Sequence, residues 1–240
     1  MFKAKILVLA VAAAAASGAY AAPLVFDPDG VGGGPSYTVD SLDWTPTAVF
    51  AEGGNAAIAN FLNNGPAESN IFTVLTHFTL STGSLNNSFV FGTGDKAYEI
   101  TAVVGFTERV TAAAGPGQNP LAPLGAASFE YVNDGNSFVR LYYDAAKNAN
   151  QLAGTGFGDG TLIFDSTVTA ATGLYRNTGG VELLDQFGAD NWGGQQTLRG
   201  QGDNSDILIN VAAPSFIDPN FFLNIPLLSF TVTNISLNNP

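Results

Sequence analysis

Two stretches of this chain alternate between apolar and polar side chains at every second residue. The apolar positions are Phe72, Val74, Phe78 and Leu80 in the first stretch and Tyr98, Ile100, Ala102, Val104 and Phe106 in the second. A period of two places successive side chains on opposite faces of an extended strand, whereas a helix needs a period near 3.6. The pattern therefore predicts antiparallel strands with one buried face.

Shorter strand signals follow along the chain, and glycine and asparagine separate them. Turn signals at intervals of about 8–12 residues are typical of an all-β sandwich. We predict an all-β fold, a mainly antiparallel β-sandwich of the jelly-roll or a related type, with about ten to fourteen strands and one or two short helical connectors. One connector is residues 56–62, which Asn55 caps and residues 63–66 stop.

Turn residues predict how several strands are connected. Residues 142–160 are typical of a strand, a glycine-rich connector and a second strand. Residues 133–136, with the sequence Asn-Asp-Gly-Asn, predict a β-hairpin. Strand 88–91 is expected to pair with strand 98–107, and residues 111–124 are expected to form a loop.

The N-terminus has the three parts of a secretory signal. Lys3 and Lys5 precede an apolar run, and Ala19-Tyr20-Ala21 has the small residues that signal peptidase needs. We predict a signal peptide at residues 1–21 and a single all-β domain at residues 22–240. The apolar run is too short for a permanent anchor, and no later stretch reaches the ~20 apolar residues of a transmembrane helix.

The charge of the chain limits its partners. It has 20 acidic and 8 basic residues, a formal net charge of −12 and no cysteine. We therefore expect no nucleic-acid partner, while neutral glycans and divalent cations stay open. Only 12% of residues are charged, so threonine, serine, asparagine and glycine must supply most of the polar surface. Without disulfides, one hydrophobic core must hold the domain, and its length allows this.

Two acidic clusters have the beginning of a calcium loop. Asp27 and Asp29 flank a proline and precede Gly30, and Asp203 and Asp206 enclose an Asn-Ser pair. The spacing resembles the first ligands of a calcium loop, but the later ligands and the bidentate glutamate are missing. Both clusters therefore favour turns, and calcium is the one cofactor that the sequence leaves open.

The polar loop around Trp192 is the best candidate for ligand recognition. It joins an aromatic ring with amide and carboxylate groups, in Asp190, Asn191, Trp192, Gln195 and Gln196. Sugar-binding surfaces use the same combination of an apolar ring face and hydrogen-bonding groups. The alternative is that a single tryptophan in a glycine-rich loop covers the edge of the core.

The titratable residues of the strands indicate no catalytic group. His77, the only histidine, falls on the polar face of its strand, where we expect it to be exposed. Glu108 and Arg109 are neighbours on a strand and point to opposite faces, which favours two solvent-facing charges. Arg140 either extends from a sheet edge or pairs with a carboxylate such as Asp165.

Composition excludes several kinds of enzyme. One histidine and no cysteine exclude the usual catalytic triads and the common zinc sites. A glycosidase needs only two carboxylates and is the remaining enzymatic alternative. Because most acidic residues here lie in turn-like contexts, we expect the protein not to be an enzyme.

Several short motifs are spread over most of the chain after the signal. They are Phe26-Asp27-Pro28-Asp29-Gly30, Asp43-Trp44-x-Pro46, Gly105-Phe106-x-Glu108, Tyr142-Tyr143-Asp144, Asn148-Ala149-Asn150-x-Leu152-x-Gly154-Thr155-Gly156-Phe157 and Gln195-Gln196-Thr197. This set resembles exported proteobacterial proteins of the PEP-CTERM sorting class. Members usually end with a Pro-Glu-Pro signal, an apolar helix and a basic cluster, which do not occur before Pro240. Either a truncated sequence or a protein that is released from the cell would account for this departure.

The resemblance implies an association with exopolysaccharide in biofilm- or floc-forming bacteria, and it implies no catalytic residue. The expected location is the cell surface or the extracellular matrix of a Gram-negative bacterium. We therefore expect a non-enzymatic matrix protein whose partner is extracellular polysaccharide. A carbohydrate-binding module that uses Trp192 is the alternative. Self-association through an exposed edge strand such as residues 229–236 is a third hypothesis.

Overall fold

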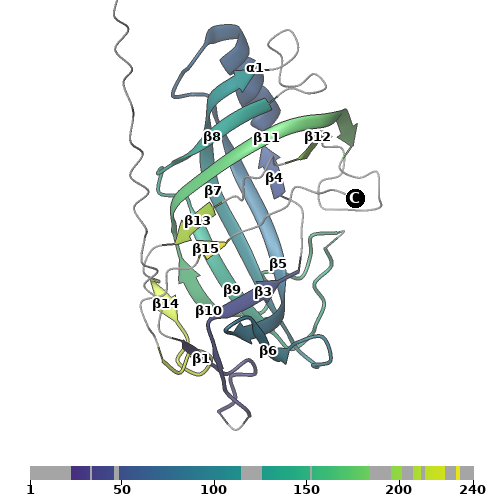
Figure 1. The fold of residues 1–240 in the computed structure, drawn as a ribbon, viewed down its shortest axis with the longest axis vertical. Helices are drawn as coiled ribbons and strands as arrows, with labels where there is room; N and C mark the ends of the chain where they lie inside the picture. Colours follow the sequence, from purple (N-terminus) through teal and green to yellow (C-terminus); the bar gives the residue numbers. More distant parts are fainter. Residues whose placement is uncertain are drawn as a thin grey trace, which may run out of the picture.

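The computed structural model describes residues 23–32, 34–45, 49–114, 126–151, 153–183, 196–201, 208–211, 214–224 and 231–232. This part of the chain contains fifteen strands and one helix, and all strand pairs are antiparallel (Figure 1). The predicted all-β, mainly antiparallel, sandwich-like fold is confirmed. Among the described residues, no helix has the length and apolar character needed to span a membrane.

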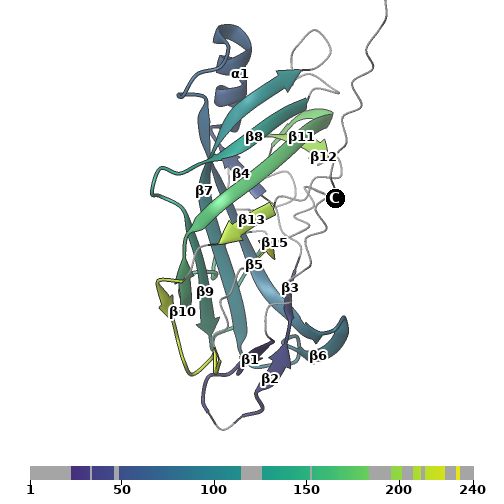
Figure 2. The same ribbon diagram turned by 60° about the vertical axis from the view of Figure 1, so that its left-hand side comes forward.

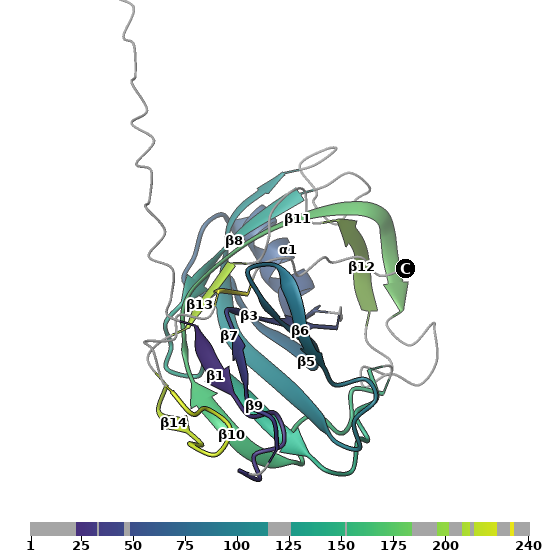
Figure 3. The same cartoon turned by 60° about the horizontal axis from the view of Figure 1, so that its bottom comes forward.

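The elements are short at the two ends of the chain and long in its middle. They are β1 (Leu24–Phe26), β2 (Tyr37–Val39), β3 (Ser41–Trp44), β4 (Val49–Glu52), α1 (Gly54–Asn64), β5 (Ile71–Leu85), β6 (Ser88–Gly92), β7 (Glu99–Ala114), β8 (Ala126–Val132), β9 (Phe138–Asp144), β10 (Thr161–Ser166), β11 (Val168–Leu183), β12 (Gln196–Gln201), β13 (Leu208–Val211), β14 (Phe216–Ile217) and β15 (Thr231–Val232). Strands β1 and β2 form a separate pair, and the other thirteen form one curved sheet (Figure 3).

Strand β7 lies at the centre of the large sheet. One of its edges pairs with β5, and the other pairs first with β9 and then with β8. Since β8 and β9 follow one another along the same edge, they do not pair with each other, and the predicted hairpin at residues 133–136 is wrong. These residues interrupt one line of pairing, and Asp134 there accepts a hydrogen bond of 2.6 Å from the Thr107 hydroxyl.

A second interruption lies beside the first. Strands β10 and β11 are separated by one residue, and they pair with β9 and β8 respectively. The Ser137 hydroxyl, between β8 and β9, accepts the Val168 N–H at 3.2 Å, and the Tyr131 hydroxyl donates to the Val168 carbonyl at 2.7 Å. Hydrogen bonds thus join the two interruptions at mid-height of the sheet.

The inner face of the sheet is the face that carries the alternating apolar residues predicted from the sequence. Phe72, Val74, Phe78 and Leu80 of β5 are all buried there. Helix α1 lies at the upper end, where Ala57 and Ile58 are buried, and β1 and β2 lie at the lower end (Figure 2). The Phe26 ring of β1 packs 5.2 Å from the Phe222 ring, which closes the core at the lower end.

The lower half of the outer face is covered by the segment between β9 and β10. This segment, residues 145–151 and 153–160, is called the connector below. Its Phe157 ring lies 4.1 Å from the His77 ring, and the Thr101 hydroxyl donates to the Phe157 carbonyl at 2.8 Å. The predicted order of strand, connector and strand at residues 142–160 is therefore confirmed, since β9 and β10 pair directly.

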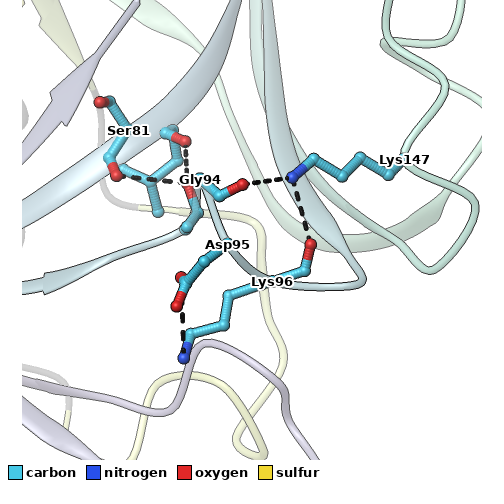
Figure 4. A network of polar contacts seen from close by, with 7 residues as sticks. Ser81, Gly94, Asp95, Lys96 and Lys147 are labelled. Atoms are coloured by element: carbon cyan, nitrogen blue, oxygen red, sulfur yellow. Dashed lines mark hydrogen bonds and ion pairs between the residues drawn. The ribbon is translucent and has the colours of Figure 1, made fainter.

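The connector is held in place by glycines and by a lysine. Gly154 and Gly156 have φ angles of 59° and 79°, a backbone conformation that glycine adopts without a steric cost. The Lys147 ammonium group donates to the carbonyls of Gly94 and Lys96, at 2.8 and 3.1 Å (Figure 4). The connector is thereby attached to the turn between β6 and β7.

Three local predictions need correction. Helix α1 begins at Gly54 after an N-cap at Gly53 with φ of 82°, so Asn55 lies inside the helix and does not cap it. Strand β6 pairs with β5 and not with β7, because Asn86 and Asn87 adopt positive φ and form a tight turn. Strand β7 continues to Ala114, so the first residues of the predicted loop at 111–124 belong to a strand.

Candidate functional site

The lower end of the inner face carries a cluster of tyrosines beside an acidic loop. The Tyr98 and Tyr143 rings lie 5.2 Å apart, and the Tyr143 ring is also 5.2 Å from Phe221. Both tyrosines are half-buried and pack against the core. We call Asp29, Tyr98 and Tyr143 the lower-rim cluster.

The acidic part of this cluster is placed by a turn that the sequence encodes. Asp27 is 2% exposed and accepts the N–H groups of Asp29 and Gly30, both at 3.2 Å. An aspartate that bonds to the backbone two and three residues later is typical of an Asx turn. Gly30 has φ of 65° and lies against the Phe221 ring, so a side chain at this position would collide with the ring.

The tyrosine hydroxyls lie within the electrostatic field of Asp29. Burial first, and then the negative charge of Asp29, raise the pKa of Tyr98 to about 12. The same two causes, in the same order, raise the pKa of Tyr143. Both hydroxyls therefore stay protonated at neutral pH, and neither one is hydrogen-bonded to another described residue.

This arrangement has the chemistry of a sugar-binding surface. Half-buried aromatic rings offer an apolar contact for a pyranose ring, and phenol groups can donate hydrogen bonds to its oxygen atoms. The Asp29 carboxylate accepts the N–H of Val31 at 3.2 Å with one oxygen, and its other oxygen can accept a bond from a sugar hydroxyl. The cluster has no positive charge, which suits a neutral ligand better than an anionic one.

The predicted calcium ligands are only partly described. Asp27 and Asp29 lie in the turn described above, while Asp203 and Asp206 lie outside the described residues. In the described part of the chain, no three His, Cys, Asp or Glu side chains are grouped as metal ligands. A calcium site therefore stays a prediction, with Asp27 already bonded to the backbone.

The predicted recognition loop around Trp192 is mostly outside the described residues. The undescribed residues of this loop include Asp190, Asn191, Trp192 and Gln195. Gln196 is the first residue of β12, where it pairs with Leu183 at the end of β11. The loop therefore stays a prediction.

His77 is buried, so the expectation of an exposed residue is wrong. Its strand has the predicted polar face, but Phe157 covers that face, and His77 is 8% exposed. Burial is the main cause that lowers its pKa below 6.5, and a backbone hydrogen bond with Gln151 acts in the opposite direction. Its Nε2 atom has no hydrogen-bond partner among the described residues.

Glu108 is also buried, so the expectation of a solvent-facing charge is wrong for this residue. It continues the buried face between Phe106 and Val110, and it is 3% exposed. Its Oε1 atom has no hydrogen-bond partner among the described residues, and burial raises the pKa of Glu108 to about 7. The prediction that positions 108 and 109 point to opposite faces was correct, but the strand is longer than expected.

Arg109 lies on the other face, at the upper end of the sheet. It forms ion pairs with Glu68 and Glu130, the second at 3.4 Å without hydrogen-bond geometry. A shallow hollow of about 410 Å³ lies here, lined by residues 66–68, 109–111 and 130. Both carboxylates are well exposed, at 89% and 53%, so water weakens these ion pairs.

Arg140 pairs with the Asp165 carboxylate, which is one of the two alternatives that the sequence left open. Its Nε atom donates to the Asp165 carboxylate at 2.9 Å, and its guanidinium lies 4.9 Å from the centre of the Phe138 ring. The ion pair joins two neighbouring strands on the outer face, β9 and β10. Arg140 therefore has a structural partner.

Sequence reasoning missed the lower-rim cluster. Tyr98 was assigned to the apolar face of its strand, and Tyr143 was assigned to the end of another strand. The sequence did contain a signal, because Tyr98 directly precedes β7 and Tyr143 is next to the last residue of β9, and these two strands pair with Ile100 opposite Tyr143. The contribution of Asp29 depends on how the β1–β2 loop packs, which the sequence does not encode locally.

Comparisons with known proteins give no further assignment. No family model matches the chain, and no curated protein or solved structure shows significant similarity to it.

Proposed function

We propose that this chain is an exported, non-catalytic protein of the bacterial cell surface or extracellular matrix, and that its lower-rim cluster binds a neutral polysaccharide. The observation that carries the proposal is the pair of half-buried tyrosine rings, 5.2 Å apart, whose hydroxyls have no hydrogen bond to another described residue. The resemblance to PEP-CTERM proteins and the predicted signal peptide support the location.

The positions of the buried titratable groups support a role without catalysis. His77 lies on the outer face beneath Phe157, and Glu108 lies on the inner face of the same sheet. A substrate cannot reach both groups at once, because the sheet separates them. Arg109 pairs with two exposed glutamates, which is typical of a solvated surface.

Affinity gel electrophoresis against a panel of neutral and acidic polysaccharides tests the proposal. We expect at least one neutral polysaccharide to retard the protein, and the double variant Tyr98→Phe, Tyr143→Phe to be retarded less. Asp29→Asn should also weaken binding, since asparagine keeps an oxygen for the Val31 N–H but loses the charge.

The matched control is Tyr142→Phe. Tyr142 is the neighbour of Tyr143 on β9 and therefore points to the opposite face of the sheet. Equal retardation of the wild type and the double variant would contradict the proposal. Binding that is lost only in Trp192→Ala would assign recognition to the predicted loop instead of the lower rim.

A further inference from the structure

The two outer strands at the lower end of β5 differ in how they are protected. Strand β3 pairs with one edge of β5, and β6 pairs with the other. Asp43 of β3 is exposed and accepts hydrogen bonds from Thr82 and Ser84 of β5. Charged side chains on an outer strand discourage pairing with a second molecule. Strand β6 has no charged residue.

The free edge of β6 is open in the described part of the chain. Residues Ser88–Gly92 pair only with β5, and no other described strand bonds to their second edge. Tyr37 of β2 stacks on Phe91 at 4.8 Å, which is a contact with the inner face and not with the edge. The backbone groups along this edge can therefore accept another strand.

A bulge in β6 turns an aromatic ring outward. The register shifts between Gly83 opposite Phe91 and Ser84 opposite Phe89, so the two phenylalanines point to different faces. Phe91 is buried over Gly83, whereas Phe89 is 71% exposed. An exposed phenylalanine on an open edge strand adds an apolar contact to the backbone bonds.

The charge distribution indicates the partner. The chain carries a net charge of −12, yet no charged residue occurs from Phe78 to Gly94. Two copies of an acidic protein repel one another wherever their carboxylates approach. At β6, two copies can approach without placing carboxylates of this segment against each other.

We propose that β6 is a self-association edge, through which two copies of this chain pair β6 against β6 in antiparallel orientation around a two-fold axis. The pairing joins the sheets of the two copies and places the two Phe89 rings near the axis. A contact of one short strand per copy buries a small area, so the dimer forms at high protein concentration and dissociates on dilution.

Analytical ultracentrifugation of the purified chain over a range of concentrations tests this proposal. We expect a concentration-dependent dimer for the wild type, which salt strengthens because it screens the net negative charge. Phe89→Glu places two like charges at the axis and should weaken the dimer about tenfold or more. Because Phe89 is exposed, circular dichroism and thermal unfolding of the variant should match the wild type.

The matched control is Val31→Glu, which adds the same charge to an exposed apolar residue, 75% accessible, outside any strand. It should leave the dimer unchanged. A wild type that stays monomeric at the highest concentration would overturn the proposal, and so would equal weakening by both variants. A loss of thermal stability in Phe89→Glu without any wild-type dimer would also overturn it, since it would indicate that another segment of the same chain covers the edge.

Discussion

The two ends of the central β5–β7 pair are built differently. At the lower end both faces are covered, the inner face by β1 and the phenylalanines around it and the outer face by the connector. At the upper end the inner face is buried beside α1, whereas Arg109 on the outer face reaches solvent and two exposed glutamates. Burial in this sheet therefore depends on which connecting segments cover each face, and not only on the alternation of apolar and polar residues.

Both ends contain buried polar groups, and each end has one titratable group with an atom that lacks a hydrogen-bond partner among the described residues. Beneath the connector, the Glu99 carboxylate accepts the Ala149 N–H at 2.6 Å, and Thr101 donates to Phe157. On the inner face at the upper end, Glu108 keeps one oxygen without a partner among the described residues. An unpaired buried carboxylate is costly, and the His77 Nε2 atom beneath the connector also has no partner among the described residues, so both ends contain a titratable group that couples stability to pH.

Removal of the Phe157 ring should have the largest effect. Phe157→Ala deletes a buried ring at the lower end, and we expect a loss of about 4 kcal/mol in the free energy of unfolding, measured in urea. The pKa of His77 should rise toward 6.5, since the burial that lowers it is lost, and NMR titration measures this. Phe138→Ala is the control, because its ring is half-buried outside the connector. Equal losses, with an unchanged His77 pKa, would contradict the proposed cover.

Glu108 should make stability depend on pH. Its carboxyl loses the proton near pH 4.5 in the unfolded chain and near pH 7 in the folded one, so stability falls as the pH rises between these values. The gap between the two pKa values corresponds to about 3 kcal/mol. Glu108→Gln should flatten this part of the profile, measured by urea unfolding at several pH values.

Comparing the wild type with Glu108→Gln separates the pH effect of Glu108 from that of His77. Burial lowers the pKa of His77, so this group removes stability as the pH falls below 6.5, but it does so in both proteins. Glu130→Gln is the control, because this carboxylate is exposed on a neighbouring strand. Identical pH profiles for the wild type and Glu108→Gln would show that the buried carboxyl has no such effect.

A glycine pair tests how tightly the connector fits the sheet. Gly156 and Gly135 have nearly the same φ, 79° and 80°, but only at Gly156 would an added Cβ lie 2.7 Å from the Asn148 carbonyl oxygen. Gly135→Ala should cost about 1 kcal/mol from the backbone alone, and Gly156→Ala about 2 kcal/mol or more. Thermal unfolding measures the difference. Equal losses of stability in the two variants would mean that the connector can shift to accommodate the added methyl group.

The smallest effect is expected at the lysine that attaches the connector. Lys147→Met removes two hydrogen bonds to backbone carbonyls and should cost about 1 kcal/mol. Lys96→Met is the control, because among the described residues the Lys96 ammonium group contacts only the exposed Asp95, at 4.0 Å, and should contribute about 0.5 kcal/mol or less. Equal stability of the two variants in urea would assign no anchoring role to Lys147.

The alternation of apolar residues predicted the strands well but did not predict their neighbours. The pattern in β5 and β7 identified the buried face correctly, and it extends to Glu108, which has the same parity as Phe106. Because carboxylates are rarely buried, the sequence favours an end of the strand at Glu108. The structure instead extends β7 to Ala114 and buries Glu108.

The turn-forming residues at positions 133–136 mark an interruption between two strands, but they do not form the predicted hairpin. Asn-Asp-Gly-Asn at residues 133–136 interrupts the strand without reversing the chain, since β8 and β9 run in the same direction along β7. His77 was misplaced for a related reason, because a segment about 80 residues later folds over it. Contacts of such long range, and the electrostatic effect of Asp29 on the tyrosines, are set by tertiary packing.

Because of the interruptions at mid-height, one edge of the long strand β7 pairs with two shorter strands instead of one. Along β7, β9 fixes the lower register and β8 the upper one, and residues 133–137 between them are free of strand pairing. An insertion of a few residues at this joint would lengthen a surface loop and leave both registers in place. Such an architecture lets evolution remodel one half of the molecule while the other half keeps its alignment.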